Sequence, residues 1–282
     1  MKRLSLTLLP LVALLLLGCG SSSDSSSSTV ASAGGCKPGA LPTEKEGVLT
    51  VATDKPAYPP YFEDDEPANG EGFESAVAYA IAKQLGYPPA KVSWTVEPFN
   101  SSYAPGPKSF DLDVNQISIT PVREKAVDFS APYYTANQAV VALKGSEAAD
   151  ADSLQELQDA ELGVQIGTTS LEAAEDRIEP GSKPQVFNSS NDVVTALKNE
   201  QIDAVVVDLP TALYLTAAQV PDATVVGQFS APGGDRWGAL LERESALTGC
   251  VSQAVEELKS SGELEKLTQR WMSKAAGAPE LH

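Results

Sequence analysis

The chain has 282 residues, a formal net charge of −18 and a mean hydropathy of −0.13. This length accommodates two lobes with a sizeable core. The acidic balance argues against nucleic-acid binding, which uses a basic surface, and against charge-driven binding to an anionic membrane. A single His at position 282 and three Cys without a C-x-x-C spacing argue against His-based triads, metal sites and thioredoxin-type redox chemistry.

Residues 1–18 have the pattern of an export signal. Cations at positions 2 and 3 precede an apolar run over 4–17, which is shorter than the ~20 residues that a membrane-spanning helix needs. The run ends in Leu-Leu-Gly-Cys19 and resembles a bacterial lipobox. We predict a lipoprotein signal peptide and a lipid on Cys19. The alternative is an ordinary secretory signal with an incidental cysteine.

Residues 19–36 are expected to form a tether. Ser fills seven of the eight positions 21–28, a composition that cannot bury enough apolar surface to fold. A lipid, a tether and a globular body describe a protein held on the outer face of a membrane. Lipidation of Cys19 leaves Cys36 and Cys250 in an oxidising compartment, so we predict a disulfide between them.

The body is predicted to alternate strands and helices. Strands are expected at 47–52, 92–96, within 110–120, 162–167 and 202–208, and helices at 72–85, 171–178, 192–199, 209–219, 246–260 and 263–274. Ser153 and Glu156 match a capping box that would open a further short helix, and Asn191 is expected to cap the helix at 192–199. The alternation indicates an α/β fold with two mostly parallel sheets.

Polar residues at strand ends are the first candidates for a binding site, because open α/β sheets bind ligands at the carboxyl ends of their strands. The candidates found in this way are Asp54, Ser118, Thr120, Thr168, Thr169 and Asp208.

Two adjacent motifs carry a family resemblance. They are Ser-Ile-Thr-x-x-Arg at 118–123 and Phe-Ser-x-Pro-Tyr at 129–133. With Gly-Phe-Glu at 72–74, Gly-Thr-Thr at 167–169 and the strand at 202–208, they resemble family 3 extracellular solute-binding proteins over residues 46–274. These are the polar amino-acid receptors of ABC importers.

The resemblance implies a two-lobed Venus flytrap of the type II periplasmic-binding-protein class. Lobe 1 would comprise 37–136 plus 233–276, lobe 2 would comprise 137–232, and 277–282 would be a tail. Two hinge strands would cross between the lobes near 134–138 and 229–235, with the ligand in the cleft between the lobes.

The resemblance also implies residues for the head group of an amino acid. Arg123 would clamp the α-carboxylate through its guanidinium fork, and Asp208 would take the α-ammonium. Ser118 would contribute to the same head group, and Thr168 with Thr169 would offer free N–H groups at a helix start. The alternatives are a surface ion pair of Arg123 with Glu124 or Asp128, and helix-capping roles for Asp208, Thr168 and Thr169.

A second group of residues would surround the ligand's side chain. Phe99 and either Tyr58 or Tyr61 would wall the pocket, unless Phe99 belongs to the core. Asp54, Asn115 and Gln116 would lie towards the side chain, although Asp54 could be a turn residue and one of the two amides could face away. The amides stand where the family often has small residues, and Gln165 stands where it often has an apolar one. These departures bear on the ligand's side chain and not on its head group. Asp54 with Asn115 and Gln116 favours a polar or cationic side chain over a branched apolar one.

The predicted function is therefore that of a membrane-anchored, monomeric binding lipoprotein. It would capture an amino acid or related zwitterion outside the cell and deliver it to an ABC permease, with no cofactor, metal or nucleic acid. One alternative on the same fold is a sensor lipoprotein. Another is a dehydratase of cyclic acids, in which Asp54 or Asp208 would act as the general acid or base.

Overall fold

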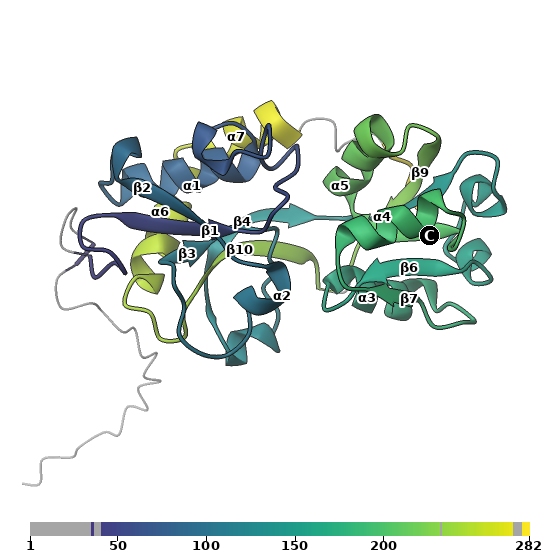
Figure 1. The fold of residues 1–282 in the computed structure, drawn as a ribbon, viewed down its shortest axis with the longest axis horizontal. Helices are drawn as coiled ribbons and strands as arrows, with labels where there is room; N and C mark the ends of the chain where they lie inside the picture. The colour runs from purple at the N-terminus through teal and green to yellow at the C-terminus, as the bar shows by residue number, and fades with distance from the viewer. Residues whose placement is uncertain (1–34, 37–40, 232, 273–277) are drawn as a thin grey trace, which may run out of the picture. The chain divides into compact units, whose positions relative to one another are not determined.

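The computed structural model describes residues 35–36, 41–231, 233–272 and 278–282 (Figure 1). The predicted signal peptide, Cys19 and most of the tether lie outside these residues. The described residues belong to one compact unit, 31–282, which contains two five-stranded sheets.

The first sheet has the strand order β2-β1-β3-β10-β4. β1 runs parallel to its neighbours β2 and β3, whereas β10 runs antiparallel to β3 and β4. The sheet consists of β1 (Leu49–Thr53), β2 (Val92–Val96), β3 (Leu112–Asp113), β4 (Asp128–Ala136) and β10 (Asp235–Leu241).

The second sheet has the order β7-β6-β8-β5-β9 and repeats the pattern. β6 runs parallel to its neighbours β7 and β8, and β5 runs antiparallel to β8 and β9. The sheet consists of β5 (Gln138–Leu143), β6 (Leu162–Gln165), β7 (Gln185–Phe187), β8 (Ala204–Asp208) and β9 (Ala223–Phe229).

The chain passes between the sheets along strands, which explains why the sheets are mixed rather than mostly parallel. It goes from β4 to β5 between Ala136 and Gln138, and it returns from β9 to β10 between Phe229 and Asp235 (Figure 1). Parallel neighbours need a crossover, usually a helix, but a strand arriving from the other sheet can pair antiparallel without one. The strand–helix–strand segments are parallel, as expected.

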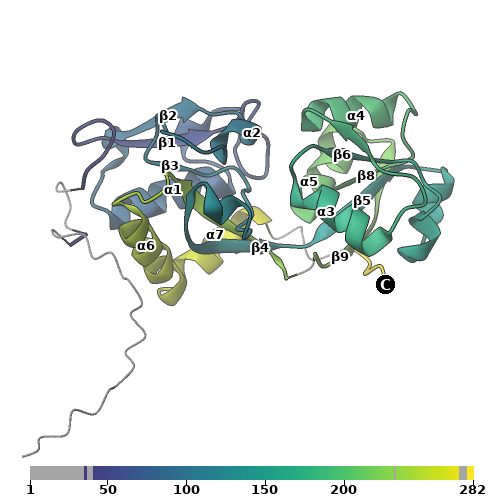
Figure 2. The same ribbon diagram turned by 90° about the horizontal axis from the view of Figure 1, so that it is seen from below.

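Helices cover each sheet. In the first lobe, α1 (Phe73–Gln84), α6 (Thr248–Ser260) and α7 (Glu263–Met272) pack around the buried Trp237. In the second, α3 (Thr169–Ala173) shares an apolar cluster with one face of the sheet, and α4 (Ser190–Lys198) and α5 (Leu209–Tyr214) share one with the other (Figure 2). A single turn, α2 (Phe99–Ser102), follows β2. Within the described ranges, none of these helices has the length and apolarity to cross a membrane.

Two predicted caps are wrong. Ser189, not Asn191, caps α4, because its hydroxyl accepts a hydrogen bond from the Asp192 N–H at 3.2 Å. Ser153 and Glu156 form no capping box, since the Glu156 carboxylate accepts instead from the Asp152 N–H, and only a short 3-10 turn follows. Helix α4 begins two residues earlier than predicted, so its cap lies two residues earlier as well, and helix boundaries are uncertain by about this much.

The predicted disulfide is present. Cys36 is bonded to Cys250 of α6, with Cα atoms 5.4 Å apart. The bond joins the start of the described chain to the first lobe.

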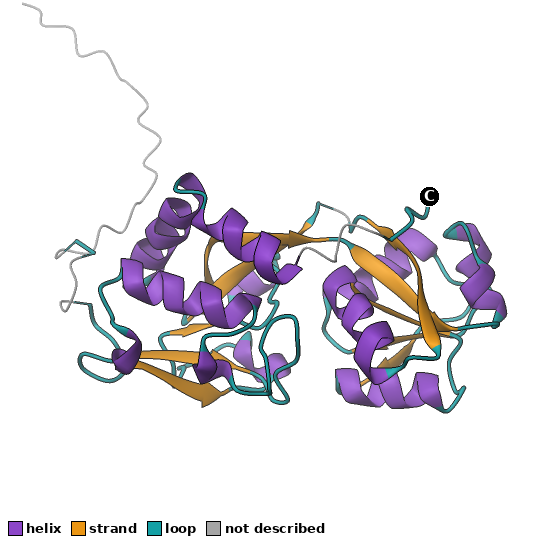
Figure 3. Cartoon of the chain, turned by 90° about the horizontal axis from the view of Figure 1, so that it is seen from above, coloured by secondary structure: helices purple, strands orange, loops and turns teal. Residues whose placement is uncertain are grey.

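The last five residues are more than a tail. The backbone of Gln228 in β9 donates to the Pro279 carbonyl at 2.7 Å and accepts from the Leu281 N–H at 2.8 Å. The Leu281 side chain is buried against Gly227, where a Cβ would approach it within 2.6 Å. The chain therefore ends on the second sheet, beside β9 (Figure 3).

A buried carboxyl group holds the turn that follows β3. Glu74, in the first turn of α1, accepts hydrogen bonds from the backbone N–H and the side-chain amide of Gln116 and from the Tyr133 hydroxyl. These contacts hold Gln116 at φ 50°, in the left-handed region, which ends the extended backbone. Burial raises the pKa of Glu74 to about 7, although its three donors act in the opposite direction.

We expect the free energy of unfolding to fall as pH rises from about 5 to about 8. Folded Glu74 keeps its proton up to about pH 7 and the unfolded chain does not, so the folded state binds more protons in this range. The Glu74 contribution is on the order of 3 kcal/mol. Urea unfolding at about pH 5 and about pH 8 should show that the free energy of unfolding falls clearly less in Glu74→Gln than in the native protein. The exposed Glu71→Gln is the control, and an unchanged fall in Glu74→Gln would contradict this account.

Candidate functional site

A cleft of about 520 Å³ is lined by residues from both lobes, a volume typical of small-molecule sites. Ten of the eleven predicted ligand residues line it: Asp54, Tyr58, Phe99, Asn115, Gln116, Ser118, Arg123, Thr168, Thr169 and Asp208. The eleventh, Tyr61, lines an adjoining cavity of about 90 Å³ together with Tyr58.

Arg123 is a buried residue and not part of a surface ion pair. It begins a 3-10 turn ahead of β4, and its side chain is only 7% exposed. Its guanidinium donates to the Ser118 carbonyl at 2.7 Å and to the Gly167 carbonyl at 2.9 Å, which come from different lobes. Asp128, a partner considered from the sequence, pairs with Arg243 instead.

The Arg123 guanidinium has no carboxylate partner among the described residues. It packs over the rings of Tyr103 and Phe99, at 4.7 and 5.4 Å from their centroids. Burial lowers the pKa of Arg123, which stays charged because a guanidinium does not lose its proton in proteins. Two of its five N–H donors serve the carbonyls, so three remain for an anion.

Asp208 closes β8 and lies in the N-cap position of α5, but its side chain does not cap that helix. Its Oδ1 accepts from the Gln138 side-chain amide at 2.7 Å. Loss of water around this carboxyl raises its pKa well above the usual value, and repulsion from Asp235 adds to the rise. Its carboxyl group also has no cation within ion-pair distance among the described residues.

The two threonines after β6 differ in their contacts. Thr168 caps α3, since its hydroxyl accepts from the Leu171 N–H at 3.3 Å and donates to the Gln165 carbonyl. The Thr169 hydroxyl lies 3.2 Å from that of Ser118 and donates to Asp235 at 2.9 Å. Thr169 therefore belongs to a polar group on the cleft floor, whereas Thr168 has the capping role considered for it.

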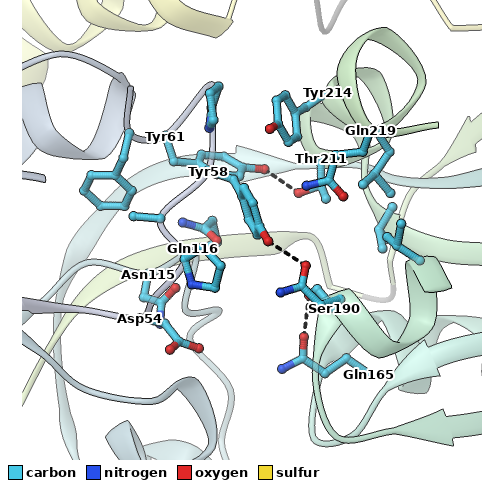
Figure 4. Close-up of a pocket in the computed structure, with 18 of the residues that line it drawn as sticks. Asp54, Tyr58, Tyr61, Asn115, Gln116, Gln165, Ser190, Thr211, Tyr214 and Gln219 are labelled. Atoms are coloured by element: carbon cyan, nitrogen blue, oxygen red, sulfur yellow. Dashed lines mark hydrogen bonds between the residues drawn. The ribbon is translucent and has the colours of Figure 1, made fainter. Parts of the chain in front are cut away.

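Two tyrosines from the first lobe face polar groups of the second (Figure 4). Tyr58 donates to the Asn191 side-chain carbonyl at 2.5 Å, and the hydroxyls of Tyr61 and Thr211 are 2.8 Å apart. Both tyrosines thus lie at the cleft, but only Tyr58 lines its larger part.

One wall of the cleft is acidic and amide-rich. Asp54 is held by the Phe99 N–H, 3.2 Å from its Oδ2, and lines both cavities with Asn115 and Gln116. Gln165 lies on the opposite wall, where its side-chain carbonyl accepts from Ser190 at 2.6 Å (Figure 4). Phe99 serves as core and wall together, because it packs on a buried cluster and also lines the cleft.

Sequence reasoning missed several residues that contact the predicted ones, among them Tyr103, Gln138, Asn191 as a partner of Tyr58, and Asp235. Gln138 and Asp235 lie where the chain was predicted to cross between the lobes. A polar residue at such a crossing is the sequence feature that could have marked both as site residues. Tyr103 carried no signal, because its contact with Arg123 depends on a loop conformation.

A comparison with protein families matches residues 49–274 to the bacterial extracellular solute-binding proteins, family 3. The arginine-binding extracellular protein ArtP of Bacillus subtilis (strain 168) is 31% identical over 96% of this chain and 98% of its own length.

Two solved structures have the same fold. An ancestral arginine-binding protein bound to arginine has a TM-score of 0.66 and 32% identity, over 80% of this chain and 98% of that one. The ancestral amino acid-binding protein AncCDT-1, a precursor of cyclohexadienyl dehydratase, has a TM-score of 0.65 and 31% identity, over 80% and 95%. By its motifs, its two-sheet fold and the span of the family match, the chain belongs to the bacterial extracellular solute-binding proteins of family 3.

Proposed function

We propose that this protein captures a free amino acid in the cleft between its two lobes. One observation carries the proposal. Arg123 and Asp208 have opposite charges, line one cleft from different lobes, and have no oppositely charged partner among the described side chains. A charge removed from water is costly unless it is paired, and a zwitterion supplies both missing partners at once.

The α-carboxylate would take the free N–H groups of Arg123, and the α-ammonium would take Asp208. Ser118 and Thr169 lie between these groups and would bond the same head group through their hydroxyls. A ligand that contacts both lobes favours the arrangement in which both contacts exist, which is how it would draw the lobes together.

The side chain of the ligand is proposed to be cationic. Asp54 lines both the cleft and the adjoining cavity, and so do Asn115 and Gln116 on the same wall and Gln165 on the opposite wall, whose side-chain amides carry carbonyl oxygens. The ammonium of Lys55, the other cation at the cleft, is 3.3 Å from Asp65 and so is already paired. An acidic side chain would meet repulsion here, and an apolar one would leave these polar groups without partners.

We further propose a lipid anchor on Cys19 and delivery of the amino acid to an ABC permease, with the protein acting as a monomer on the outer face of the membrane. The signal pattern at 1–18 supports the anchor. Native protein extracted from membranes should carry diacylglycerol on Cys19 by mass spectrometry, and Cys19→Ser should be released into the medium. Membrane retention of Cys19→Ser would rule out the anchor.

A dehydratase is the second candidate function. The observation in its favour is Asp208, whose raised pKa would keep a proton available for a general acid. Binding accounts for the same carboxyl without turnover. Mass spectrometry of ligand recovered after incubation distinguishes the two, because a binding protein returns it unchanged.

Arg123→Ala is expected to weaken L-arginine binding by at least about 100-fold, because the ligand carboxylate would be buried without a partner. Isothermal titration calorimetry measures the loss. Arg123→Lys keeps the charge but not the fork and should lose about tenfold. The exposed Arg236→Ala should bind as the native protein does. Near-native affinity in a folded Arg123→Ala would overturn the proposed function.

Asp54→Asn should weaken binding of L-arginine about tenfold and that of L-glutamine less than about twofold, because only a cationic side chain loses an ionic partner. Competition titrations of both ligands give the ratio. The matched control is Asp64→Asn, an exposed residue of the following loop. Equal losses for the two ligands would contradict the cationic assignment.

A further inference from the structure

Two carboxyl groups, and not one, lie at the ammonium end of the cleft floor. The Gln138 side-chain amide donates to Asp208 Oδ1 at 2.7 Å and to Asp235 Oδ2 at 2.6 Å. The three residues come from the first position of β5, the last of β8 and the first of β10. Two of these strands begin where the chain crosses between the lobes, so the pair is part of the crossing itself.

If both acids are ionised, the pair has more hydrogen-bond acceptors than donors. Asp235 is 2% exposed, and its Oδ1 has no partner, nor does the Oε1 of the fully buried Gln138. The Asp208 and Asp235 carboxyls are neighbours, because both accept from the same side-chain nitrogen of Gln138, and repulsion from Asp235 contributes to the raised pKa of Asp208. Ionised carboxylates can only accept hydrogen bonds, so a bond between two of them needs a proton on one.

The groups facing the pair do not neutralise two negative charges. Arg123 is the cation that acts on Asp208, and it is attracted by Asp235 and by the exposed Glu172 as well. Tyr61 and Tyr134 face Asp208 as neutral phenols, because burial raises the pKa of each. Glu74 acts on Tyr61 and supplies no cation, and its pKa of about 7 leaves it partly protonated near neutral pH. Thr169 contributes one neutral donor, to Asp235.

We propose that Asp235 is a second acid of the ammonium site and that Asp208 keeps a proton, which it donates to Asp235 in a hydrogen bond, while the cleft is free. The α-ammonium of an incoming amino acid then replaces that proton as the donor between the carboxyls, and the proton leaves to solvent. The charge of the pair and its occupant is the same before and after, because one positive charge leaves as another arrives. This inference rests on the proposed function and adds Asp235 and the released proton to it.

Release of about one proton per ligand makes affinity depend on pH. The association constant should rise up to about tenfold per pH unit wherever the pair holds its proton, and should level off at higher pH. A site with one ionised aspartate would show no such rise between about pH 6 and pH 8, since its carboxylate and the ligand's ammonium both keep their charge there.

Calorimetry of L-arginine and L-glutamine binding, near neutral pH in phosphate and in Tris, counts the protons. The observed heat differs between the buffers by the number released times the difference in their ionisation enthalpies. The native protein should release about one, and Asp235→Asn about none. The amide introduced by Asp235→Asn donates to Asp208 in place of that proton, so this variant should bind with an affinity that hardly changes with pH.

Three controls separate this account from others. Asp222→Asn, an exposed acid-to-amide change, should keep the proton release. Glu74→Gln should also keep it, because Glu74 titrates near neutral pH without contacting the ammonium site. Circular dichroism reports whether each variant folds. If Asp235→Asn does not fold, the proton count of the native protein alone decides.

The outcomes are distinct. Binding of either amino acid without proton release by the native protein overturns this inference and leaves the proposed function standing. Proton release that persists in folded Asp235→Asn, or vanishes in Glu74→Gln, overturns the assignment to Asp235. Failure of both ligands to bind overturns the proposed function and the inference with it.

Discussion

The cleft depends on keeping two buried opposite charges apart. Arg123 and Asp208 would gain most by pairing with each other, yet each is bonded only to dipoles of the protein. Carbonyl groups of Ser118 and Gly167 solvate the guanidinium, and the Gln138 amide solvates the carboxyl. A hydrogen bond between two ions is stronger than one between an ion and a neutral dipole. An oppositely charged ligand group would therefore bind each of these side chains more strongly than the present protein contacts do. Strands ending at the same cleft from two sheets make this separation possible.

The sequence predicted most of the cleft lining because its residues follow strand ends or short local motifs. Arg123, Ser118 and Asp208 occupy places that a strand end or a motif defines. Strands bounded by turn-forming residues were also predicted accurately, and β2 has the predicted bounds, Val92–Val96. In these places, local sequence and final environment agree.

The features that sequence reasoning missed depend on partners far along the chain. The turn at Gln116, after β3, is held by Glu74, 42 residues earlier. Asp235 acquires its role from Gln138, 97 residues earlier, and from Thr169, 66 residues earlier. Asn191 was read as a cap, whereas its side chain contacts Tyr58 of the other lobe. No local pattern encodes such contacts, because they exist only once the sheets have formed.

The anchored C-terminus has a practical consequence. The chain passes from one sheet to the other along β4–β5, returns along β9–β10, and passes again between Met272 of α7 and Ala278. Because the chain passes between the sheets three times, the two ends of the body lie on different lobes. Cys36 is bonded to α6 in the first lobe, and Leu281 is buried beside β9 in the second. Fluorescent proteins fused at these two ends would therefore be attached to opposite lobes. Energy transfer between them would report movement of the lobes without a label inside the body.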